Sequence, residues 1–339
     1  MDIHHILGFF WSFFISVFAI PSIINVAHYK KLLDEPGSRT VHVSLTPRLG
    51  GLAIFAGFAS AYTIFGSVIQ EVQQIIAGCI VLFFIGLKDD IVSVSPFKKF
   101  FVQILAAGIV VFMGDLRITS FQGVFGIYEL EYGLSYGITF LVIIGITNAV
   151  NLIDGLDGLA ASLTLVMISI FGYYFAQSNT NEAYSYAGIA FCIGGSIVGF
   201  LRYNIFKAVI FMGDTGSLIC GFLISILAIK FLEMKLVSAA PATTIAIIII
   251  PLVDTIRVFS IRILKGRSPF SPDKNHLHHN IARFGMNSIK VVLALCCINL
   301  VFFITVRTFN EVSDTYLILS MIIVSVLLCS IFEIRKRIA

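Results

Sequence analysis

Long runs without a charged residue dominate the chain. Eleven stretches of 15 or more residues contain no Asp, Glu, Lys or Arg: 3–29, 49–70, 72–87, 100–114, 132–153, 158–181, 183–201, 215–229, 236–253, 291–306 and 315–332. A helix of about 20 apolar residues spans a bilayer, and the shorter runs reach that length with a flanking residue or two at each end. Transmembrane β-strands are about half as long and alternate in polarity, which these runs do not. The pattern predicts an all-α polytopic membrane protein with about eleven transmembrane helices, organised as one integral membrane domain over residues 1–339.

One connection between these runs has a different pattern. Residues 115–131 read DLRITSFQGVFGIYELE, with alternating apolar positions on both sides of Gly123. Alternation around a glycine turn is typical of a β-hairpin. We therefore expect a small extracytoplasmic hairpin near 115–131.

The charges fix an orientation for these helices. The chain is 58% hydrophobic and only 12% charged, against about 25% charged in soluble domains, which excludes a soluble globule. When the eleven runs are threaded through a membrane, 19 of the 23 Lys and Arg residues fall on one side. By the positive-inside rule that side is cytoplasmic, so the N-terminus is outside and the C-terminus inside. The basic residues are spread along helix ends, which favours membrane lipids or a phosphorylated ligand and not nucleic acid as partners.

The cytoplasmic side also carries four polar motifs, each directly at the end of an apolar run. They are GLKDD (86–90), NAVNLIDGLDG (148–158), NIFKAVIFMGDTGS (204–217) and GRSPFSPDKNHLHHN (266–280). An ion-coupled transporter is the alternative from another class, but transporters place ionisable groups near the middle of the bilayer. Here the acidic residues bracket the apolar runs, so we expect an active site on the cytoplasmic face of the plasma membrane.

Carboxylates and amides in the first two motifs suggest a shared cation or proton. Asp89 and Asp90 are adjacent and repel each other, so a third, positive partner is expected. A helix-capping turn explains one Asn or Asp of the second motif but not four at every third position. We expect glycines in this motif to break the helix and to let its four polar residues line one pocket, namely Asn148, Asn151, Asp154 and Asp157.

The last two motifs favour a metal ion together with phosphate. Asp214 stands between glycines at the expected start of a helix, where anions bind, and an Asp beside a phosphate points to a divalent cation between them. Hard oxygen ligands favour Mg²⁺, with Mn²⁺ as the alternative, over zinc. The spacing of His276, His278 and His279 matches structural zinc sites poorly, and with Arg267 these side chains suit phosphate oxygens. This chemistry indicates phosphoryl transfer to a lipid.

The motifs, in this order and at these intervals, resemble those of the polyprenyl-phosphate N-acetylhexosamine-1-phosphate transferases. The segment VHVSLTPRLGGLAIF at 41–55 resembles a further motif of that family, and the resemblance extends from about residue 34 to 290. It implies that a UDP-N-acetyl sugar and undecaprenyl phosphate give a lipid-linked sugar diphosphate and UMP, with Mg²⁺ required. A homodimer is a candidate assembly.

The resemblance also implies roles for single residues. Asp214 would be the principal metal ligand and Asn151 a second one. Asp89 and Asp90 would face the lipid phosphate, one of them as base or orienting group, and Asp154 would act near the diphosphate. The substrate-binding residues would be Asn148, Asp157, Asn204 and Phe211 toward the nucleotide side, and Arg267, His276, His278 and His279 toward sugar and phosphate oxygens.

Two motif details choose a branch of the family. The branch that transfers phospho-MurNAc-pentapeptide shows PTMGG and three consecutive histidines, whereas this chain has PRLGG at 47–51 and HLHH at 276–279. The second pattern is that of the branch using UDP-GlcNAc to begin O-antigen, enterobacterial common antigen or teichoic acid. UDP-GlcNAc is therefore the expected donor, with UDP-MurNAc-pentapeptide and UDP-FucNAc-type sugars as the alternatives.

Overall fold

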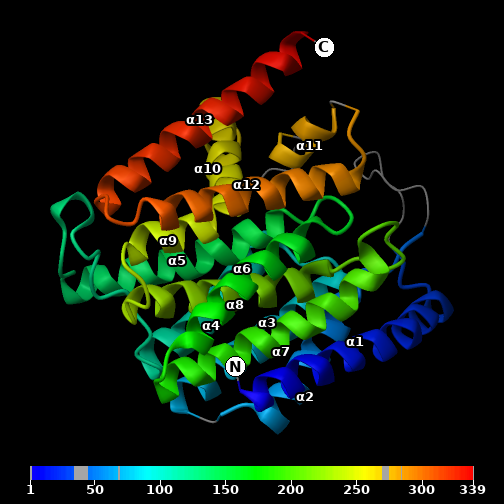
Figure 1. Cartoon of the computed structure of the whole chain (residues 1–339). Helices are drawn as coiled ribbons and strands as arrows, with labels where there is room; N and C mark the ends of the chain where they lie inside the picture. The colour runs from blue at the N-terminus through cyan, green and yellow to red at the C-terminus, as the bar shows by residue number, and fades with distance from the viewer. Residues whose placement is uncertain (1, 34–44, 68, 269–274, 284, 339) are drawn as a thin grey trace.

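The architecture is a bundle of long helices (Figure 1). The computed structural model describes residues 2–33, 45–67, 69–268, 275–283 and 285–338, and only the backbone of 332–338. In chain order the helices are α1 (Ile3–Lys30), α2 (Gly50–Phe65), α3 (Gln70–Ile91), α4 (Pro96–Gly108), η1 (Ile109–Met113), η2 (Val124–Gly126), α5 (Tyr132–Leu152), α6 (Leu159–Gln177), α7 (Asn181–Asn204), α8 (Gly213–Glu233), α9 (Ala240–Ile247), α10 (Ile249–Leu264), α11 (Leu277–Ala282), α12 (Ser288–Thr308) and α13 (Asp314–Ile338).

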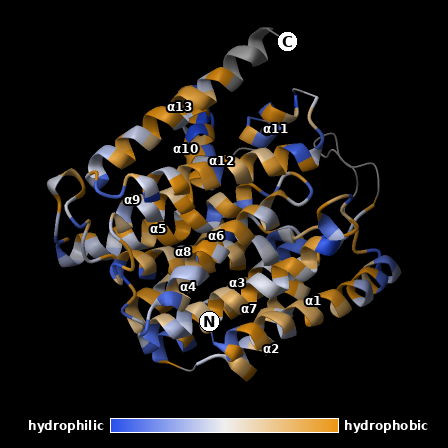
Figure 2. Ribbon diagram, in the orientation of Figure 1, coloured by the Kyte–Doolittle hydropathy of each residue, from blue (hydrophilic) through white to orange (hydrophobic). Residues whose placement is uncertain are grey.

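Each of the eleven apolar runs contains at least one helix in the described part of the chain, which confirms the all-α prediction. Among the described residues, nine helices are long and apolar enough to cross a membrane, α4 reaching that length together with η1. The pair α9 and α10 forms a further candidate span with a bend of 72°, and α2 is a shorter apolar helix of 16 residues. The helices are largely apolar in Figure 2, and the side chains that they expose include many large hydrophobic ones, as a lipid environment requires.

The bend between α9 and α10 has a local cause in the sequence. Pro251 lies in the first turn of α10 and has no N–H to donate to the carbonyl of Ile247, four residues earlier. The side chain of Asn299, fully buried on α12, donates instead to that carbonyl at 3.0 Å. The run 236–253, expected as one helix, is therefore two helices joined at an angle.

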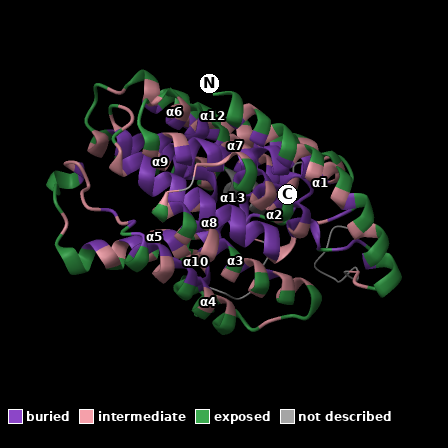
Figure 3. Cartoon of the chain, turned by 90° about the horizontal axis from the view of Figure 1, so that it is seen from below, coloured by how far each residue is buried: buried purple, intermediate pink, exposed green. Residues whose placement is uncertain are grey.

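Helix α8 forms the centre of the bundle. It packs against α2, α3, α5 and α6. In its most apolar stretch of 18 residues, 94% of the residues are buried, against 22% in the corresponding stretch of α1 at the periphery (Figure 3). A helix that is apolar around its whole circumference is stable only when other helices surround it. The position of α8 fixes both of its ends within the protein.

A cluster of charges joins three helices at the C-terminal end of α8. The Nζ atom of Lys230 lies 2.8 Å from Glu71 Oε2 and 2.6 Å from Glu182 Oε1. Tyr186 donates its hydroxyl to Glu71 at 2.7 Å. Lys230, Glu71 and Glu182 form one charge cluster. It ties the end of α8 to the starts of α3 and α7.

The 115–131 segment lies at this same end of the bundle, opposite α11 (Figure 1). It folds back on itself with a single antiparallel bridge between Ser120 and Glu129. The described residues contain no β-strand longer than this bridge. Thr119 donates its N–H and hydroxyl to Glu233 of α8, at 2.9 and 2.6 Å. The expected β-hairpin is thus present only as this bridge and three backbone hydrogen bonds across the turn, from the N–H groups of Leu130, Phe121 and Gly123. Which end faces the cytoplasm stays a prediction from the Lys and Arg distribution.

Candidate active site

The first turn of α8 is capped by an acidic residue from another helix. Asp90, near the end of α3, accepts hydrogen bonds from the Asp214 N–H at 2.7 Å and the Thr215 N–H at 3.0 Å. The Thr215 hydroxyl donates to the same carboxylate at 2.5 Å. The first N–H groups of a helix have no partner within it, and a carboxylate also suits the positive end of the helix dipole. Asp90 therefore holds α3 and the start of α8 together.

Two glycines let the backbones approach closely enough for this contact. A Cβ on Gly86 would lie 2.5 Å from the Thr215 Cα, so α3 and α8 touch backbone to backbone. Gly213 has φ +72°, and a Cβ there would collide with the Arg48 carbonyl and lie 2.6 Å from Asp90. Positive φ and this lack of space both require glycine. The glycines of the GLKDD and FMGDTGS motifs thus bring their aspartates together.

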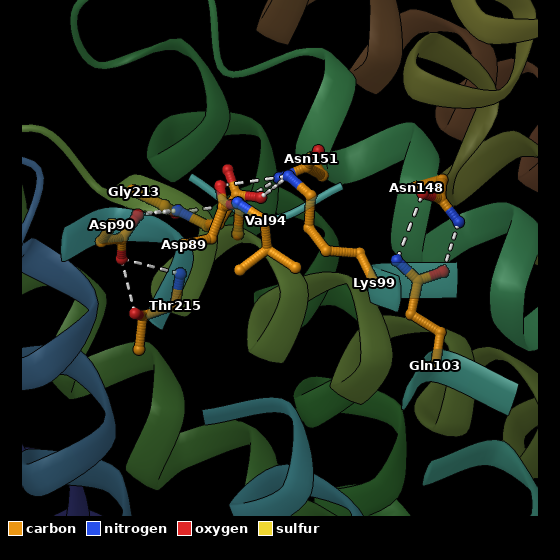
Figure 4. Close-up of polar contacts among 11 residues, drawn as sticks. Asp89, Asp90, Val94, Lys99, Gln103, Asn148, Asn151, Gly213 and Thr215 are labelled. Atoms are coloured by element: carbon orange, nitrogen blue, oxygen red, sulfur yellow. Dashed lines mark hydrogen bonds and ion pairs between the residues drawn. The ribbon is translucent and has the colours of Figure 1, made fainter. Parts of the chain in front are cut away.

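Lys99 links the other two aspartates of these motifs. Its ammonium lies 3.1 Å from Asp89 Oδ2 and 2.6 Å from Asp214 Oδ2 (Figure 4). The second oxygen of Asp89 accepts from the Val94 N–H at 2.6 Å, which fixes the turn between α3 and α4. Lys99 was not among the residues selected from the sequence, where it counted only as one of the basic residues on the inner side.

The Asn residues of the second motif point in different directions. Asn151 donates to the Ser217 hydroxyl at 2.8 Å, which places its amide beside the first turn of α8. Asn148, one turn earlier on α5, forms a reciprocal amide pair with Gln103 of α4, at 2.6 and 3.3 Å (Figure 4). It donates in addition to the Ile144 carbonyl at 2.8 Å. The structure brings Asn151 to the aspartates and uses the side chain of Asn148 to join two helices.

Asp154 is an accessible carboxylate among other acidic groups. Although solvent reaches the side chain, the surrounding protein desolvates it enough to raise its pKa to about 7. The charges of Asp214 and Asp90 raise the pKa further, and that of Arg48 lowers it. Like charges that disfavour ionisation mark a place where a cation would be stabilised. Asp154 therefore belongs to the same negative site as Asp214.

The expected nucleotide-binding residues join the second and third motifs. Asn204, which is buried, accepts from the Gly158 N–H at 2.8 Å and donates to the Ile210 carbonyl at 2.9 Å. Asp157 accepts from the Ala208 N–H at 3.2 Å. The ring of Phe211 is partly exposed, and its N–H donates to the Pro47 carbonyl at 2.8 Å. These contacts hold the loops on either side of the aspartates in a fixed relation.

A buried aspartate of α10 binds the histidine loop. Asp254 Oδ2 lies 2.8 Å from the Nδ1 atom of His276, and Oδ1 accepts from the Leu277 N–H at 2.8 Å. A carboxylate at Nδ1 fixes the orientation of an imidazole and leaves Nε2 for a ligand. Arg257 adds a hydrogen bond to the Asn275 carbonyl at 2.8 Å. Asp254 is a second residue that the sequence did not assign to the site, although a carboxylate directly after the apolar run 236–253 was a signal.

His278 connects this loop to the second motif. A Cβ on Gly155 would lie 2.5 Å from the His278 Nε2 atom, so the ring rests on the glycine backbone. Burial, and next the neighbouring His279, lower the pKa of His278 to about 3, so its ring is neutral at neutral pH. Neither ring nitrogen has a hydrogen-bond partner within the described part of the chain. A buried imidazole without partners suits a site that binds a polar ligand.

The remaining candidates lie around this loop. His279 packs its ring against His278, with centroids 4.2 Å apart. Arg267 is exposed just beyond α10, where its N–H bonds the Arg262 carbonyl at 2.9 Å. Residues 41–44 and 269–274 of the motifs lie outside the described residues. The structure thus joins the motifs through the pairs Asp90 and Asp214, Asn151 and Ser217, Gly158 and Asn204, and Gly155 and His278.

Comparisons with known proteins identify relatives of this chain. The sequence profile of glycosyl transferase family 4 matches residues 72–232, which include three of the four motifs. The chain is 34% identical over 302 residues to the "probable undecaprenyl-phosphate N-acetylglucosaminyl 1-phosphate transferase" of Bacillus subtilis (strain 168), covering 88% of this chain and 83% of that protein.

Two further relatives come from other bacterial groups. The "undecaprenyl-phosphate alpha-N-acetylglucosaminyl 1-phosphate transferase" of Escherichia coli (strain K12) is 31% identical over 271 residues, 78% of this chain and 72% of that protein. The "decaprenyl-phosphate N-acetylglucosaminephosphotransferase" of Mycobacterium leprae (strain TN) is 32% identical over 312 residues, 83% and 77% of the two chains. Since these relatives are matched over most of their length, the chain belongs to glycosyl transferase family 4.

Proposed function

We propose that this chain transfers GlcNAc 1-phosphate from UDP-GlcNAc to undecaprenyl phosphate, releasing UMP, at the cytoplasmic face of the bacterial plasma membrane. The product would begin the synthesis of a cell-surface polysaccharide. The single observation that carries the proposal is the convergence of Asp89, Asp90, Asp154 and Asp214 with the histidine loop at one end of a membrane-spanning bundle. The names of three relatives support GlcNAc as the sugar and a polyprenyl phosphate as the acceptor.

Mg²⁺ is part of this proposal, and the donor atoms at the start of α8 suit it. No group of three His, Cys, Asp or Glu residues in the described ranges could hold a metal by itself. Mg²⁺ is commonly held by one or two carboxylates together with water and substrate phosphates. Asp214, with a quarter of its side chain exposed, and the oxygen of the Asn151 amide would supply such a partial set. When bound, Mg²⁺ would neutralise charge on the donor diphosphate.

The residues of the chain would act mainly by alignment. The acceptor phosphate has a second pKa of about 6 and is largely dianionic at neutral pH, so it needs little help from a base. Asp90 has its carboxylate bonded to Asp214 and Thr215, which supports an orienting role for it. His276, which donates its Nδ1 proton to Asp254, would accept at Nε2 a hydrogen bond from a sugar hydroxyl. Phosphoryl transfer depends mostly on such positioning and on charge stabilisation.

The test is a reaction with purified components. The protein in detergent, with Mg²⁺ and undecaprenyl phosphate, should release UMP from UDP-GlcNAc and form a lipid-linked GlcNAc diphosphate. Release of UMP only from UDP-MurNAc-pentapeptide or a UDP-FucNAc-type sugar would contradict the donor.

A pair of variants tests the proposed site. Asp214→Ala should abolish UMP release at every Mg²⁺ concentration. Asp115→Ala, which removes a carboxylate of the 115–131 segment whose side chain is 76% exposed, is the matched control and should be fully active. Equal activity of the two variants would remove Asp214 from the reaction.

A further inference from the structure

An ammonium group occupies the space between two carboxylates of the site. Lys99, in the first turn of α4, reaches Asp214 Oδ2 at 2.6 Å and Asp89 Oδ2 at 3.1 Å (Figure 4). The three side chains are 23%, 25% and 15% exposed, so the ion pairs lie at the border between protein and solvent. α3, α4 and α8 each contribute one member.

This arrangement sets Lys99 against the proposed cation. The 2.6 Å contact uses a lone pair of the same Asp214 carboxylate that would bind Mg²⁺. Two positive charges about 4 Å apart repel each other strongly where the surroundings are only partly hydrated. The contact with Asp89 is longer, at 3.1 Å, and the other oxygen of Asp89 accepts from the Val94 N–H at 2.6 Å. The ion pair between Lys99 and Asp214 and the binding of Mg²⁺ to Asp214 would therefore weaken each other.

We propose that Lys99 is a resident counter-ion of Asp214, which has to withdraw before a divalent cation binds there. The proposal rests on the function given above, because it takes Asp214 as the metal ligand. Lysine suits this exchange, since its ammonium is a point charge on a flexible four-carbon stem. On withdrawal the ammonium needs another anion, and phosphate is the class of anion that both substrates carry. Phosphate binding and metal binding would then assist each other through Lys99.

The competing explanation is a permanent ion pair. Lys99 would then only fasten α4 to α8, and the cation would use the other oxygen of Asp214. This explanation predicts that the affinity for the cation does not depend on the position of Lys99. A direct measurement of metal binding separates the two.

Mn²⁺ is a suitable probe because its binding to the full-length protein in detergent is measured by electron paramagnetic resonance without turnover. Lys99→Met keeps the length of the side chain and removes its charge. In the absence of nucleotide and lipid, we expect this variant to bind Mn²⁺ about tenfold more tightly than the unmodified protein, as for loss of one charge-assisted contact. Lys98→Met, at the neighbouring exposed lysine, is the matched control and should bind as the unmodified protein does. Equal Mn²⁺ affinity of Lys99→Met and the unmodified protein would overturn the proposal.

A second measurement uses the unmodified protein and so does not depend on the variant folding. Acylation of lysines, read by mass spectrometry, should increase at Lys99 when Mn²⁺ is added, because the ammonium leaves its carboxylates. Acylation of Lys98 should not change. Unchanged labelling of Lys99 at saturating Mn²⁺ would contradict the exchange.

Two phosphate ligands identify the anion that receives Lys99. UDP or undecaprenyl phosphate, added separately, should tighten Mn²⁺ binding to the unmodified protein. In Lys99→Met, the ligand whose phosphate binds the Lys99 ammonium should no longer tighten Mn²⁺ binding to the same extent. If each ligand changes the Mn²⁺ affinity by the same factor in the unmodified protein and in Lys99→Met, the exchange of Lys99 for the metal is refuted. If the unmodified protein binds no Mn²⁺ even with UDP, the proposed metal site itself fails.

Discussion

The Asp90 cap on α8 can be tested by removing its carboxylate. Asp90→Ala deletes the acceptor of three hydrogen bonds, which measure 2.7, 3.0 and 2.5 Å. A bond to a charged group contributes about 1.5–3 kcal/mol, and loss of a helix N-cap costs about 0.5–2 kcal/mol. The three bonds share one partly exposed carboxylate, and water replaces part of them. We therefore expect the free energy of unfolding to fall by about 3 kcal/mol, between the cost of one cap and the sum of three separate bonds.

The measurement is reversible unfolding in mixed micelles, followed as SDS is increased. Thr215→Val removes the hydroxyl but keeps the backbone N–H, so it should cost about 1.5 kcal/mol, the lower end of the range for one bond to a charged group. The double variant should cost little more than Asp90→Ala, because both changes remove the same bond. Asp115→Ala serves as the control and should stay within about 0.5 kcal/mol of the unmodified protein.

One result would refute this reasoning. If Asp90→Ala unfolds at the same SDS concentration as the unmodified protein but releases no UMP, then the carboxylate acts on a substrate and not on α8. A fall in the free energy of unfolding of the expected size would instead support the cap.

Three further substitutions test other contacts. Gly86→Val places a branched side chain against the Thr215 backbone, so a loss of about 3 kcal/mol or more in unfolding free energy is expected. Asp254→Asn offers an N–H to the Nδ1 atom of His276 and so favours the wrong tautomer, which should raise the KM for the donor about tenfold while unfolding changes little. Lys230→Met leaves two partly exposed glutamates without their cation, which should cost about 2 kcal/mol and leave UMP release per folded molecule unchanged.

Each of these has its own control. Gly137, where a Cβ meets no atom within 4 Å, should accept Val without comparable loss. Adding Asp254→Asn to His276→Ala should change the KM no further. Lys235→Met, at an exposed lysine near Lys230, should leave the unfolding free energy close to normal. If a control variant behaves like its test variant, the proposed cause is wrong: backbone contact for Gly86→Val and ion pairing for Lys230→Met. A further rise in KM in the double variant would likewise exclude the His276 tautomer as the cause for Asp254→Asn.

The sequence predicted the helices well because hydropathy is a local property. Each apolar run contains a helix, and the helix start expected at Asp214 is confirmed, with Asp90 of another helix as its cap. The bend in 236–253 was missed although Pro251 signalled it, because run length alone does not show where a backbone bond is lost. The loop at 115–131 was predicted too regular, because bonds to Glu233 were not foreseeable from its own pattern.

The site was predicted as a place and not as a set of contacts. Charge counting put the motifs at one end of the bundle, and the structure brings their members together there. The partners depend on how each helix is rotated, which hydropathy does not encode. Asn148 was assigned to substrate and pairs with Gln103, and Lys99 was counted with the inner basic residues and lies between Asp89 and Asp214.

Insertions and deletions within the central helix α8 should not be tolerated between its two anchored ends. Asp214 and Lys230 lie sixteen residues apart on it, which corresponds to about 24 Å along the axis. Each is held by partners from other helices, so inserting one residue between them would turn one end by about 100° and break its contacts. Chimeras that exchange this helix between family members should therefore succeed only when the spacing between these two positions is preserved.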